Sequence, residues 1–311
     1  MMEQDVNLTV DFAGLQLATP VMTASGTCGY ADELSEFMDM SALGGITTKS
    51  ITLKPRKGNP TPRIVETSAG MLNAIGLANM GMDQFIEEKV PILDQLDTRI
   101  FVNLAGQTID EYVTVAERLA KEPAIDGFEL NISCPNVKKG GITFGTDPKL
   151  IKEITAAVKN VCLGKPLMVK LTPTVMDISV TAAAAVEAGA DALGLVNTFT
   201  AMVIDIQKRT PVLANRTGGL SGPAIKPIAV YLVNKVYNEV ARDAGIPILG
   251  MGGIRTASDA LEFIIAGATA VGIGTATFVY PDTAKNIIHG LADYCRQEGL
   301  SNISELVGSL R

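Results

Sequence analysis

The residues of this 311-residue chain best suited to chemistry form a polar run directly after an apolar one. Residues 127–131 alternate as a buried strand would, and an amide, a hydroxyl, a thiol and a proline then follow at Asn131, Ser133, Cys134 and Pro135. A lone cysteine is more often a small buried hydrophobic residue than a nucleophile or a base. Polar neighbours are costly to bury unpaired, however, so a polar ligand beside Cys134 explains this run better than packing does.

A flexible segment follows the polar run. It contains Lys138, Lys139, Gly140, Gly141 and Gly145, and it is long for a simple connection. Such loops in compact domains are often lids over a site. We therefore expect Cys134 to lie at the base of a movable cover.

Two glycine-rich runs, residues 250–255 and 271–276, end the last two predicted strands. In β/α barrels the loops after strands seven and eight commonly bind a phosphate through backbone N–H groups and a helix N-terminus. The run that contains Gly272 and Gly274 lacks the third glycine of a dinucleotide fingerprint. These runs therefore predict a phosphorylated mononucleotide here, not NAD.

Lysines and asparagines also stand at predicted strand ends or in a long loop. Lys49 and Lys170 would ordinarily extend to water at the rim, but two lysines directed toward one cavity could hold anionic groups. Asn73, Asn131 and Asn197 each offer donors and an acceptor, which complement an imide or ureide edge. One asparagine could equally stabilise a turn. Three of them favour a pyrimidine-like ring as the ligand.

Eight apolar, β-rich runs would position these residues, and most precede a helical pattern. Together they predict an α/β (β/α)8 TIM barrel that occupies residues 1–311 as one domain. The predicted strands are residues 21–25, 45–49, 100–103, 127–131, 166–170, 192–197, 246–250 and 270–274. The predicted helices are residues 109–120, 148–161, 179–188, 227–244 and 257–265.

Three further segments complete the predicted architecture. Residues 8–12 and 15–17 read as a short N-terminal β-hairpin that plugs one end of the barrel. The connections 52–79 and 198–223 are longer than the others, and both leave the carboxyl ends of their strands. We expect both to fold over the active face.

The motifs resemble those of a known enzyme family. Residues 131–136, Asn-Ile-Ser-Cys-Pro-Asn, resemble the active-site segment of the class 1 dihydroorotate dehydrogenases. Residues 58–63 and 73–77 most resemble the catalytic subunit of the B-type, NAD-linked enzyme. The similarity runs from about Leu8 to the last residues, with the motifs in order.

The resemblance implies an FMN-binding flavoprotein that oxidises dihydroorotate to orotate in de novo pyrimidine (UMP) biosynthesis. Carried over by motif, the residues that would contact the flavin are Ser25, Gly26, Lys49, Ser50, Asn103, Asn131, Lys170, Val196, Gly222, Gly252, Gly253, Gly274 and Thr275. The residues that would contact the substrate are Lys49, Asn73, Ala74, Ile75, Gly76, Leu77, Asn131, Asn197 and Thr198.

The implied mechanism uses two catalytic residues. Cys134 would take the C5 proton while hydride leaves C6 for the flavin, from the face away from the flavin. Lys49 would lie between flavin and substrate, and Lys170 would stabilise the reduced, anionic flavin. Lys138 could help raise the thiolate fraction of Cys134.

The electrons taken from the substrate must pass to another protein, because the chain has neither a cysteine motif for an iron–sulfur cluster nor a dinucleotide fingerprint. The resemblance implies a partner subunit carrying FAD and a [2Fe-2S] cluster, which joins a dimer of barrels as a heterotetramer and passes electrons to NAD. We expect Cys28, Cys162 and Cys295 to be packing residues, and His289 to lie on the surface of a helix.

Composition excludes several other classes. The net charge of -7 argues against nucleic-acid binding, no apolar run is long enough to span a membrane, and the acidic N-terminus lacks the features of a signal peptide, so we expect a cytoplasmic protein. A single histidine and scattered cysteines exclude a histidine triad and predict no metal site.

Three alternatives stay open. One is an A-type dihydroorotate dehydrogenase, a homodimer that reduces fumarate, although residues 61–63 and 68–73 favour the B-type. Another is a barrel like that of dihydropyrimidine dehydrogenase, which also has a cysteine acid/base. The third is a barrel that binds FMN without catalysis, against which Lys49, Asn131 and Cys134 argue.

Overall fold

A closed barrel of eight parallel strands forms the centre of the structure, a computed structural model that describes residues 6–132, 138–139 and 142–311. The strands follow one another round the barrel in chain order. They are β3 (Val21–Thr23), β4 (Gly45–Thr47), β7 (Arg99–Leu104), β8 (Gly127–Asn131), β11 (Leu167–Lys170), β12 (Ala192–Leu195), β17 (Ile248–Met251) and β18 (Ala270–Ile273). The predicted TIM barrel and its eight strands are confirmed.

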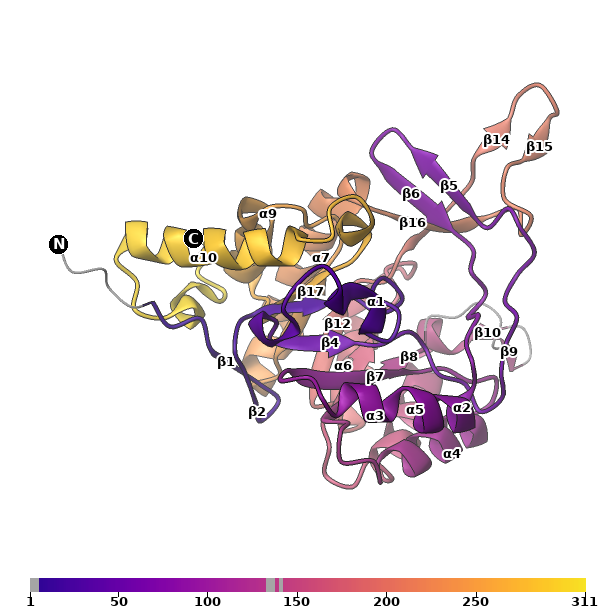
Figure 1. Ribbon diagram of the computed structural model, residues 1–311, viewed down its shortest axis with the longest axis horizontal. Helices are drawn as coiled ribbons and strands as arrows, with labels where there is room; N and C mark the ends of the chain where they lie inside the picture. Colours follow the sequence, from indigo (N-terminus) through magenta and orange to yellow (C-terminus); the bar gives the residue numbers. More distant parts are fainter. Residues whose placement is uncertain (1–5, 133–137, 140–141) are drawn as a thin grey trace.

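Helices surround the barrel (Figure 1). The longer ones are α4 (Ile109–Leu119), α5 (Pro148–Lys159), α6 (Ile178–Glu187), α7 (Lys226–Val236), α9 (Ala257–Ala266) and α10 (Thr283–Glu298). Shorter segments are α1 (Asp32–Ser35), η1 (Met40–Ala42), α2 (Met82–Glu88), α3 (Val90–Leu93), η2 (Phe144–Thr146), η3 (Pro223–Ile225), η5 (Thr275–Phe278) and η6 (Ile303–Leu306). No helix within the described ranges is both long enough and apolar enough to cross a membrane.

Side-chain caps explain where several helices begin. The side chains of Thr108, Asp147, Asp177 and Thr256 each accept a hydrogen bond from the first turn of the helix that follows, at 2.9–3.2 Å. Such caps satisfy N–H groups that have no partner within the helix. They begin α4, α5, α6 and α9 and thus set where each helix leaves the rim.

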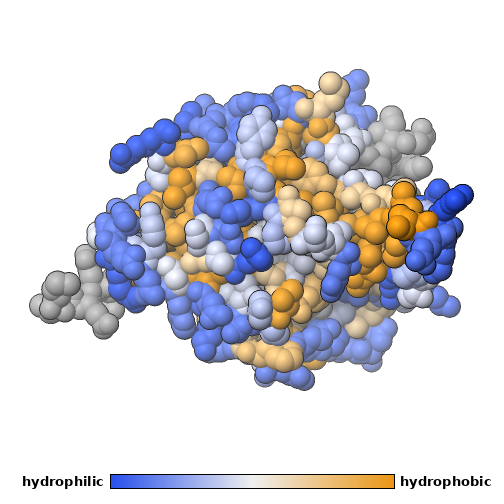
Figure 2. All heavy atoms as spheres, turned by 90° about the horizontal axis from the view of Figure 1, so that it is seen from above, coloured by the Kyte–Doolittle hydropathy of each residue, from blue (hydrophilic) through white to orange (hydrophobic). Residues whose placement is uncertain are grey.

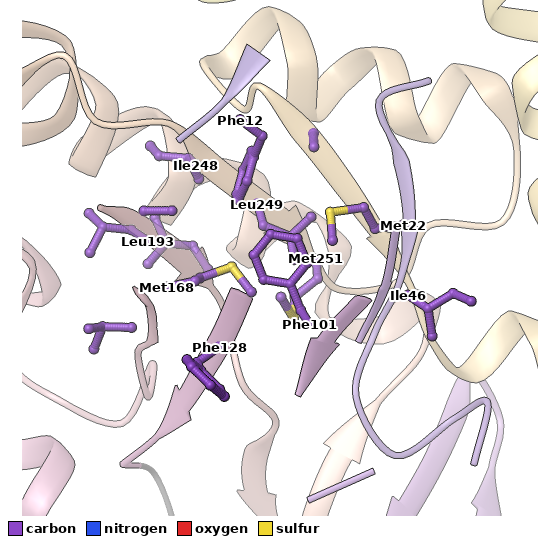
Figure 3. Close-up of a cluster of buried hydrophobic side chains, with 14 of the residues drawn as sticks. Phe12, Met22, Ile46, Phe101, Phe128, Met168, Leu193, Ile248, Leu249 and Met251 are labelled. Atoms are coloured by element: carbon purple, nitrogen blue, oxygen red, sulfur yellow. The ribbon is translucent and has the colours of Figure 1, made fainter. Parts of the chain in front are cut away.

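The N-terminal hairpin is confirmed as β1 (Val10–Phe12) paired with β2 (Leu15–Leu17). It lies at the amino ends of the barrel strands, far from the carboxyl rim (Figure 1). Phe12 is fully buried, and its ring meets that of Phe101 edge to face at 6.1 Å between centroids. Figure 3 shows Phe12 within the cluster that also holds Met168, Leu249 and Met251. The hairpin therefore closes the amino end of the barrel with an aromatic side chain.

The two long connections form one projecting sheet. Its strands are β13 (Phe199–Ala201), β16 (Gly218–Ser221), β6 (Gly70–Asn73) and β5 (Ile64–Thr67), in that order. A small β14 (Ile204–Asp205) and β15 (Thr210–Pro211) hairpin extends it. Leu72, Ala74 and Leu213 give the sheet a small core of its own. As expected, both connections lie on the carboxyl side of the barrel (Figure 1).

Two predictions of local structure need correction. The segment predicted as a flexible loop contains a hairpin of β9 (Lys138–Lys139) and β10 (Ile142–Thr143) followed by η2, while residues 133–137 and 140–141 are outside the described ranges. The single helix predicted for residues 227–244 is α7, a π-helical segment η4 (Tyr237–Ala241) and α8 (Arg242–Ala244). A π turn widens the helix by one residue, which apolar spacing does not reveal.

Exposed apolar side chains gather on the projecting sheet and its hairpin. Ile64 is 50% exposed, Met202 45%, Ile204 56% and Ile206 83%. Seen from above, hydrophobic and hydrophilic side chains lie next to one another at this end of the molecule (Figure 2). An apolar surface of this kind is typical of protein contacts.

The plug formed by Phe12 gives a stability prediction. Phe12→Ala should lower the free energy of unfolding by about 3–5 kcal/mol, because it removes a buried ring and leaves a cavity beside Phe101. Urea unfolding followed by circular dichroism measures the change. The matched control is Gln16→Ala, an exposed position of the same hairpin, which should change stability by less than about 0.5 kcal/mol. Equal effects of the two substitutions would show that Phe12 does not plug the barrel.

Candidate active site

Polar side chains from three barrel strands and from the loop after β3 meet at the carboxyl rim. The Lys170 Nζ donates to Ser25 Oγ at 2.9 Å and lies 3.6 Å from Glu129 Oε1. The Asn103 Nδ2 also donates to Ser25 Oγ, at 3.2 Å, and to Glu129 Oε1. Asn131 Nδ2 lies 3.5 Å from Asn103 Oδ1. These five residues form one hydrogen-bonded group, here called the rim cluster.

Strand register explains why the rim cluster forms. Asn103 of β7 pairs with Glu129 of β8, and Asn131 of β8 pairs with Lys170 of β11. Alternate residues of a strand face the same side, so Glu129 and Asn131 both point into the barrel. The predicted flavin contacts Ser25, Asn103, Asn131 and Lys170 are therefore brought together. Asn103 is fully buried, and Lys170 is only 5% exposed.

Sequence reasoning missed Glu129 and Tyr112 as members of this site. Glu129 is fully buried and provides the only carboxylate of the rim cluster. The Tyr112 hydroxyl, on α4, donates to the Asn131 backbone carbonyl at 2.7 Å. A charged residue within the apolar run 127–131 was the available signal for Glu129. The signal for Tyr112 is weaker, because its distance from Asn131 depends on how α4 packs.

Glycines and hydroxyls that follow β16, β17 and β18 or end β16 meet on the carboxyl side of the barrel. The Gly253 backbone approaches Gly222 so closely that a Cβ on Gly253 would lie 2.7 Å from the Gly222 carbonyl oxygen. The Thr275 hydroxyl donates to Ser221 Oγ at 2.8 Å. The predicted phosphate-binding residues after β17 and β18 thus lie beside Gly222, as a cradle of backbone groups. A cradle of this kind suits an anion.

The N-terminus of α9, the helix that follows β17, is less suited to bind a phosphate than the sequence predicts. The Asp259 carboxylate accepts hydrogen bonds from the backbone N–H groups of Arg255 and Thr256, both at 3.0 Å. This capping box places a negative charge at the beginning of α9. Any phosphate in the cradle would therefore rely on the glycine backbones and not on this helix N-terminus.

The substrate residues predicted in the long connections lie in or next to the projecting sheet. Asn73 ends β6, and it pairs with Gly219 of β16. Thr198 lies directly against Gly219, where a Cβ would come within 2.0 Å of the Thr198 hydroxyl. The Ala74 N–H already donates to the Arg63 carbonyl at 2.8 Å, so in the run 73–77 this group is not available to a ligand.

The remaining predicted residues follow β4 and β12. Lys49 is half-buried, its backbone N–H donates to the Gly29 carbonyl at 2.8 Å, and no ion pair joins its ammonium to another described residue. Ser50 is buried next to it. Val196 is buried after β12, and the Asn197 side-chain oxygen accepts from the Thr198 N–H at 2.8 Å.

The thiols separate into two groups. Cys134, predicted to be the base, lies outside the described residues. Cys28, Cys162 and Cys295 are buried and free of disulfides, as packing residues should be. Burial raises the pKa of the Cys28 and Cys162 thiols to about 12, so neither forms a thiolate near neutral pH. His289 lies on the exposed face of α10, as predicted.

The described arrangement offers donors for an anionic ligand and a backbone cradle that suits a phosphate. The rim cluster offers an ammonium and two amides, the cradle offers backbone groups, and the projecting sheet, on the same side of the barrel, carries the Asn73 amide. Among the described residues, no group of three or more His, Cys, Asp or Glu could hold a metal ion.

Comparison with known proteins identifies the family. Residues 7–294 match the family described as "Dihydroorotate dehydrogenase". The "Dihydroorotate dehydrogenase B (NAD(+)), catalytic subunit" of Geotalea daltonii is 53% identical over 305 residues, which covers 98% of both chains. The protein of the same description from Alkaliphilus metalliredigens is 51% identical over 305 residues, which covers 98% of this chain and 99% of that protein.

A solved structure agrees with these matches. The dihydroorotate dehydrogenase of Eimeria tenella, described in complex with ferulenol, superposes with a TM-score of 0.79 at 25% identity, covering 99% of this chain and 90% of that one. The family match and the two bacterial relatives, each more than 50% identical over almost the full length, confirm the resemblance seen in the motifs. The chain belongs to the dihydroorotate dehydrogenase family, among its B-type, NAD-linked catalytic subunits.

Proposed function

We propose that residues 1–311 act as one FMN-binding barrel domain on which dihydroorotate is oxidised to orotate, a step of UMP biosynthesis. The observation that carries the proposal is the rim cluster, in which Lys170, Asn103 and Asn131 converge beside the glycine cradle. A buried ammonium and two amides at the carboxyl end of a barrel suit a polar, anionic ligand better than they suit packing.

The family depends on FMN, and the residues at this rim fit that group. FMN bound there supplies the hydride acceptor for the reaction. Lys170 would hold the edge that becomes anionic on reduction, because a fixed ammonium favours negative charge in a buried site. Gly222, Gly253 and Thr275 would contact the phosphate, and the remaining proposed contacts are Ser25, Gly26, Lys49, Ser50, Val196, Gly252 and Gly274.

The projecting sheet would supply the substrate contacts. Asn73, Asn131 and Asn197 would pair with the ring amide groups of dihydroorotate, and Thr198 would donate its hydroxyl. The substrate carboxylate would lie against the backbone of residues 75–77. Lys49 is half-buried without an ion pair to a described residue, which supports a role in binding anionic groups of the substrate.

Cys134 would act as the general base. Its thiolate would remove the proton from C5, while hydride leaves C6 on the opposite face of the ring. The pKa of an ordinary cysteine lies above neutral, so nearby donors or cations would have to stabilise the thiolate. The three other thiols are buried, which leaves Cys134 as the thiol proposed for this step.

The electrons would leave through a second protein. The names of the bacterial relatives include the words "catalytic subunit" and "NAD(+)", so those proteins work with at least one other subunit. We propose a partner that carries FAD and [2Fe-2S] and joins two barrels in a heterotetramer with two of each subunit. These names favour NAD over the fumarate of an A-type enzyme. Cytoplasmic location stays a prediction.

Charge distribution supports an anionic substrate. The two connections that build the projecting sheet, residues 52–79 and 198–223, hold seven lysines and arginines but only two acidic residues, whereas the whole chain has 26 basic and 33 acidic residues. Of these cations, Lys54, Lys57, Arg209 and Arg216 are exposed and lie in no ion pair with a described residue. A basic region on an acidic protein attracts small anions toward the site below it.

The base gives the first functional prediction. Cys134→Ala should lower the turnover of dihydroorotate by about 100-fold to 10,000-fold, because the C5 proton loses its acceptor. FMN content and dihydroorotate affinity should stay close to those of the unmodified protein. Stopped-flow absorbance of flavin reduction measures the step directly.

The matched control for this substitution is Cys162→Ala. Its thiol is buried far from the rim and donates to the Val158 carbonyl at 3.2 Å, so its loss should leave flavin reduction unchanged. Unchanged reduction in Cys134→Ala would exclude Cys134 as the base.

The basic connections give the second functional prediction. Replacing Lys54 and Lys57 together by glutamate should lower kcat/KM at low ionic strength about threefold to tenfold, because the substrate anion is no longer attracted. The loss should shrink in 0.5 M salt, where screening extends only a few ångströms. Lys121→Glu, just after the C-terminal end of α4, changes an exposed charge at the opposite, amino side of the barrel and serves as the control. A salt-independent loss would point to a distorted loop and away from attraction.

A further inference from the structure

Glu129 is a buried carboxylate that the proposed reaction does not use. It is fully buried within β8, and it faces the barrel interior next to Lys170. Its Oε1 accepts a hydrogen bond from the Asn103 amide. Its Oε2 is buried with no hydrogen-bond partner in the described structure. The carboxylate is therefore only partly compensated.

Packing alone does not explain an acidic residue here. Burying a carboxylate is unfavourable unless an opposite charge and hydrogen bonds compensate for it, and a well-packed apolar residue is often at least as stable. Deeper in the same barrel, β7 and β11 place Phe101 and Met168 in the core. An apolar side chain at position 129 would continue that core. The charge itself must therefore have a role.

The geometry links this charge to Lys170. The Lys170 ammonium lies between the Ser25 hydroxyl at 2.9 Å and the Glu129 carboxylate at 3.6 Å. Its direction is thus fixed, and its positive charge faces a negative one within the barrel. Two opposite charges this close produce a weaker field at a neighbouring ligand than a lone ammonium does.

We propose that Glu129 is a positioning residue that holds Lys170 in place and offsets part of the charge that Lys170 presents to the bound flavin. The bound FMN is consequently harder to reduce, with a lower reduction potential, than Lys170 alone would make it. This inference rests on the proposed function.

The chemistry of the overall reaction gives this adjustment a purpose. The two electrons taken from dihydroorotate must leave the flavin again, toward a pyridine nucleotide that accepts electrons only from a strong reductant. A lone ammonium would stabilise the reduced flavin and hold the electrons on this chain. A carboxylate behind the ammonium keeps the lysine as a hydrogen-bond donor while it limits that stabilisation.

The test is the reduction potential of the FMN bound to Glu129→Gln. Glutamine keeps the shape and an acceptor oxygen but removes the negative charge. The midpoint potential, measured by equilibration with redox dyes under anaerobic conditions, should rise relative to the unmodified protein. An unchanged or lower potential would overturn the proposal.

The control variant is Asp191→Asn, which removes a carboxylate paired with a lysine at the opposite end of the barrel. Asp191 lies 2.5 Å from the Lys159 ammonium and accepts from the Leu167 N–H at 2.7 Å. Its loss should leave the flavin potential unchanged, because the charge lies at the amino ends of the strands. An equal rise in both variants would mean that net charge, and not the contact with Lys170, sets the potential.

A second variant covers the case in which Glu129→Gln does not fold. Glu129→Asp keeps the charge but withdraws it from Lys170 by one methylene, so the potential should rise by a smaller amount, and no rise would contradict the proposal.

The measurements also distinguish a failure of this proposal from a failure of the proposed function. A chain that binds no FMN, or whose FMN dihydroorotate cannot reduce, contradicts the proposed function, whereas normal reduction at an unchanged potential contradicts only the role of Glu129.

Discussion

Closure of eight parallel strands into a barrel is the constraint on which the site depends. Because all strands run in one direction, their carboxyl ends meet at one rim, and residues far apart in sequence become neighbours there. Ser25 and Lys170 are 145 positions apart, yet their side chains are 2.9 Å from each other. The opposite end is closed by the buried ring of Phe12. The barrel can therefore keep a charged group near its core while access is restricted to one side.

The rim cluster shows how such a charge is accommodated. The Ser25 hydroxyl and the Glu129 carboxylate both compensate the ammonium of Lys170, and the Asn103 amide donates to each of these two acceptors. Hydrogen bonds in a buried network strengthen one another and restrict each side chain to one orientation. A ligand would thus meet donors that are already in place, which reduces the reorganisation needed during the reaction.

The sequence predicted the barrel, the order of its strands and most of the rim residues, because apolar runs that end in polar residues are a local signal. The positions of Asn131 and Lys170 followed from where those runs end. Glu129 could not be assigned, since its role comes from register with β7 and β11 and not from its neighbours in sequence. The pairing of β6 with β16 was equally invisible: Met71 and Ser221 are 150 positions apart, and no local pattern specifies their contact. The sequence does not predict the hairpin of β9 and β10, because glycines and lysines mask a two-residue pairing.

An anaerobic absorption spectrum of the purified chain shows directly whether the rim binds a flavin that dihydroorotate reduces. Spectra are recorded before and after addition of dihydroorotate and again with NAD present. We expect a yellow FMN band that dihydroorotate bleaches, and no NADH until a partner subunit is added. A chain without that band, or a flavin that dihydroorotate leaves oxidised, would contradict FMN-dependent oxidation at the rim while leaving the barrel fold intact.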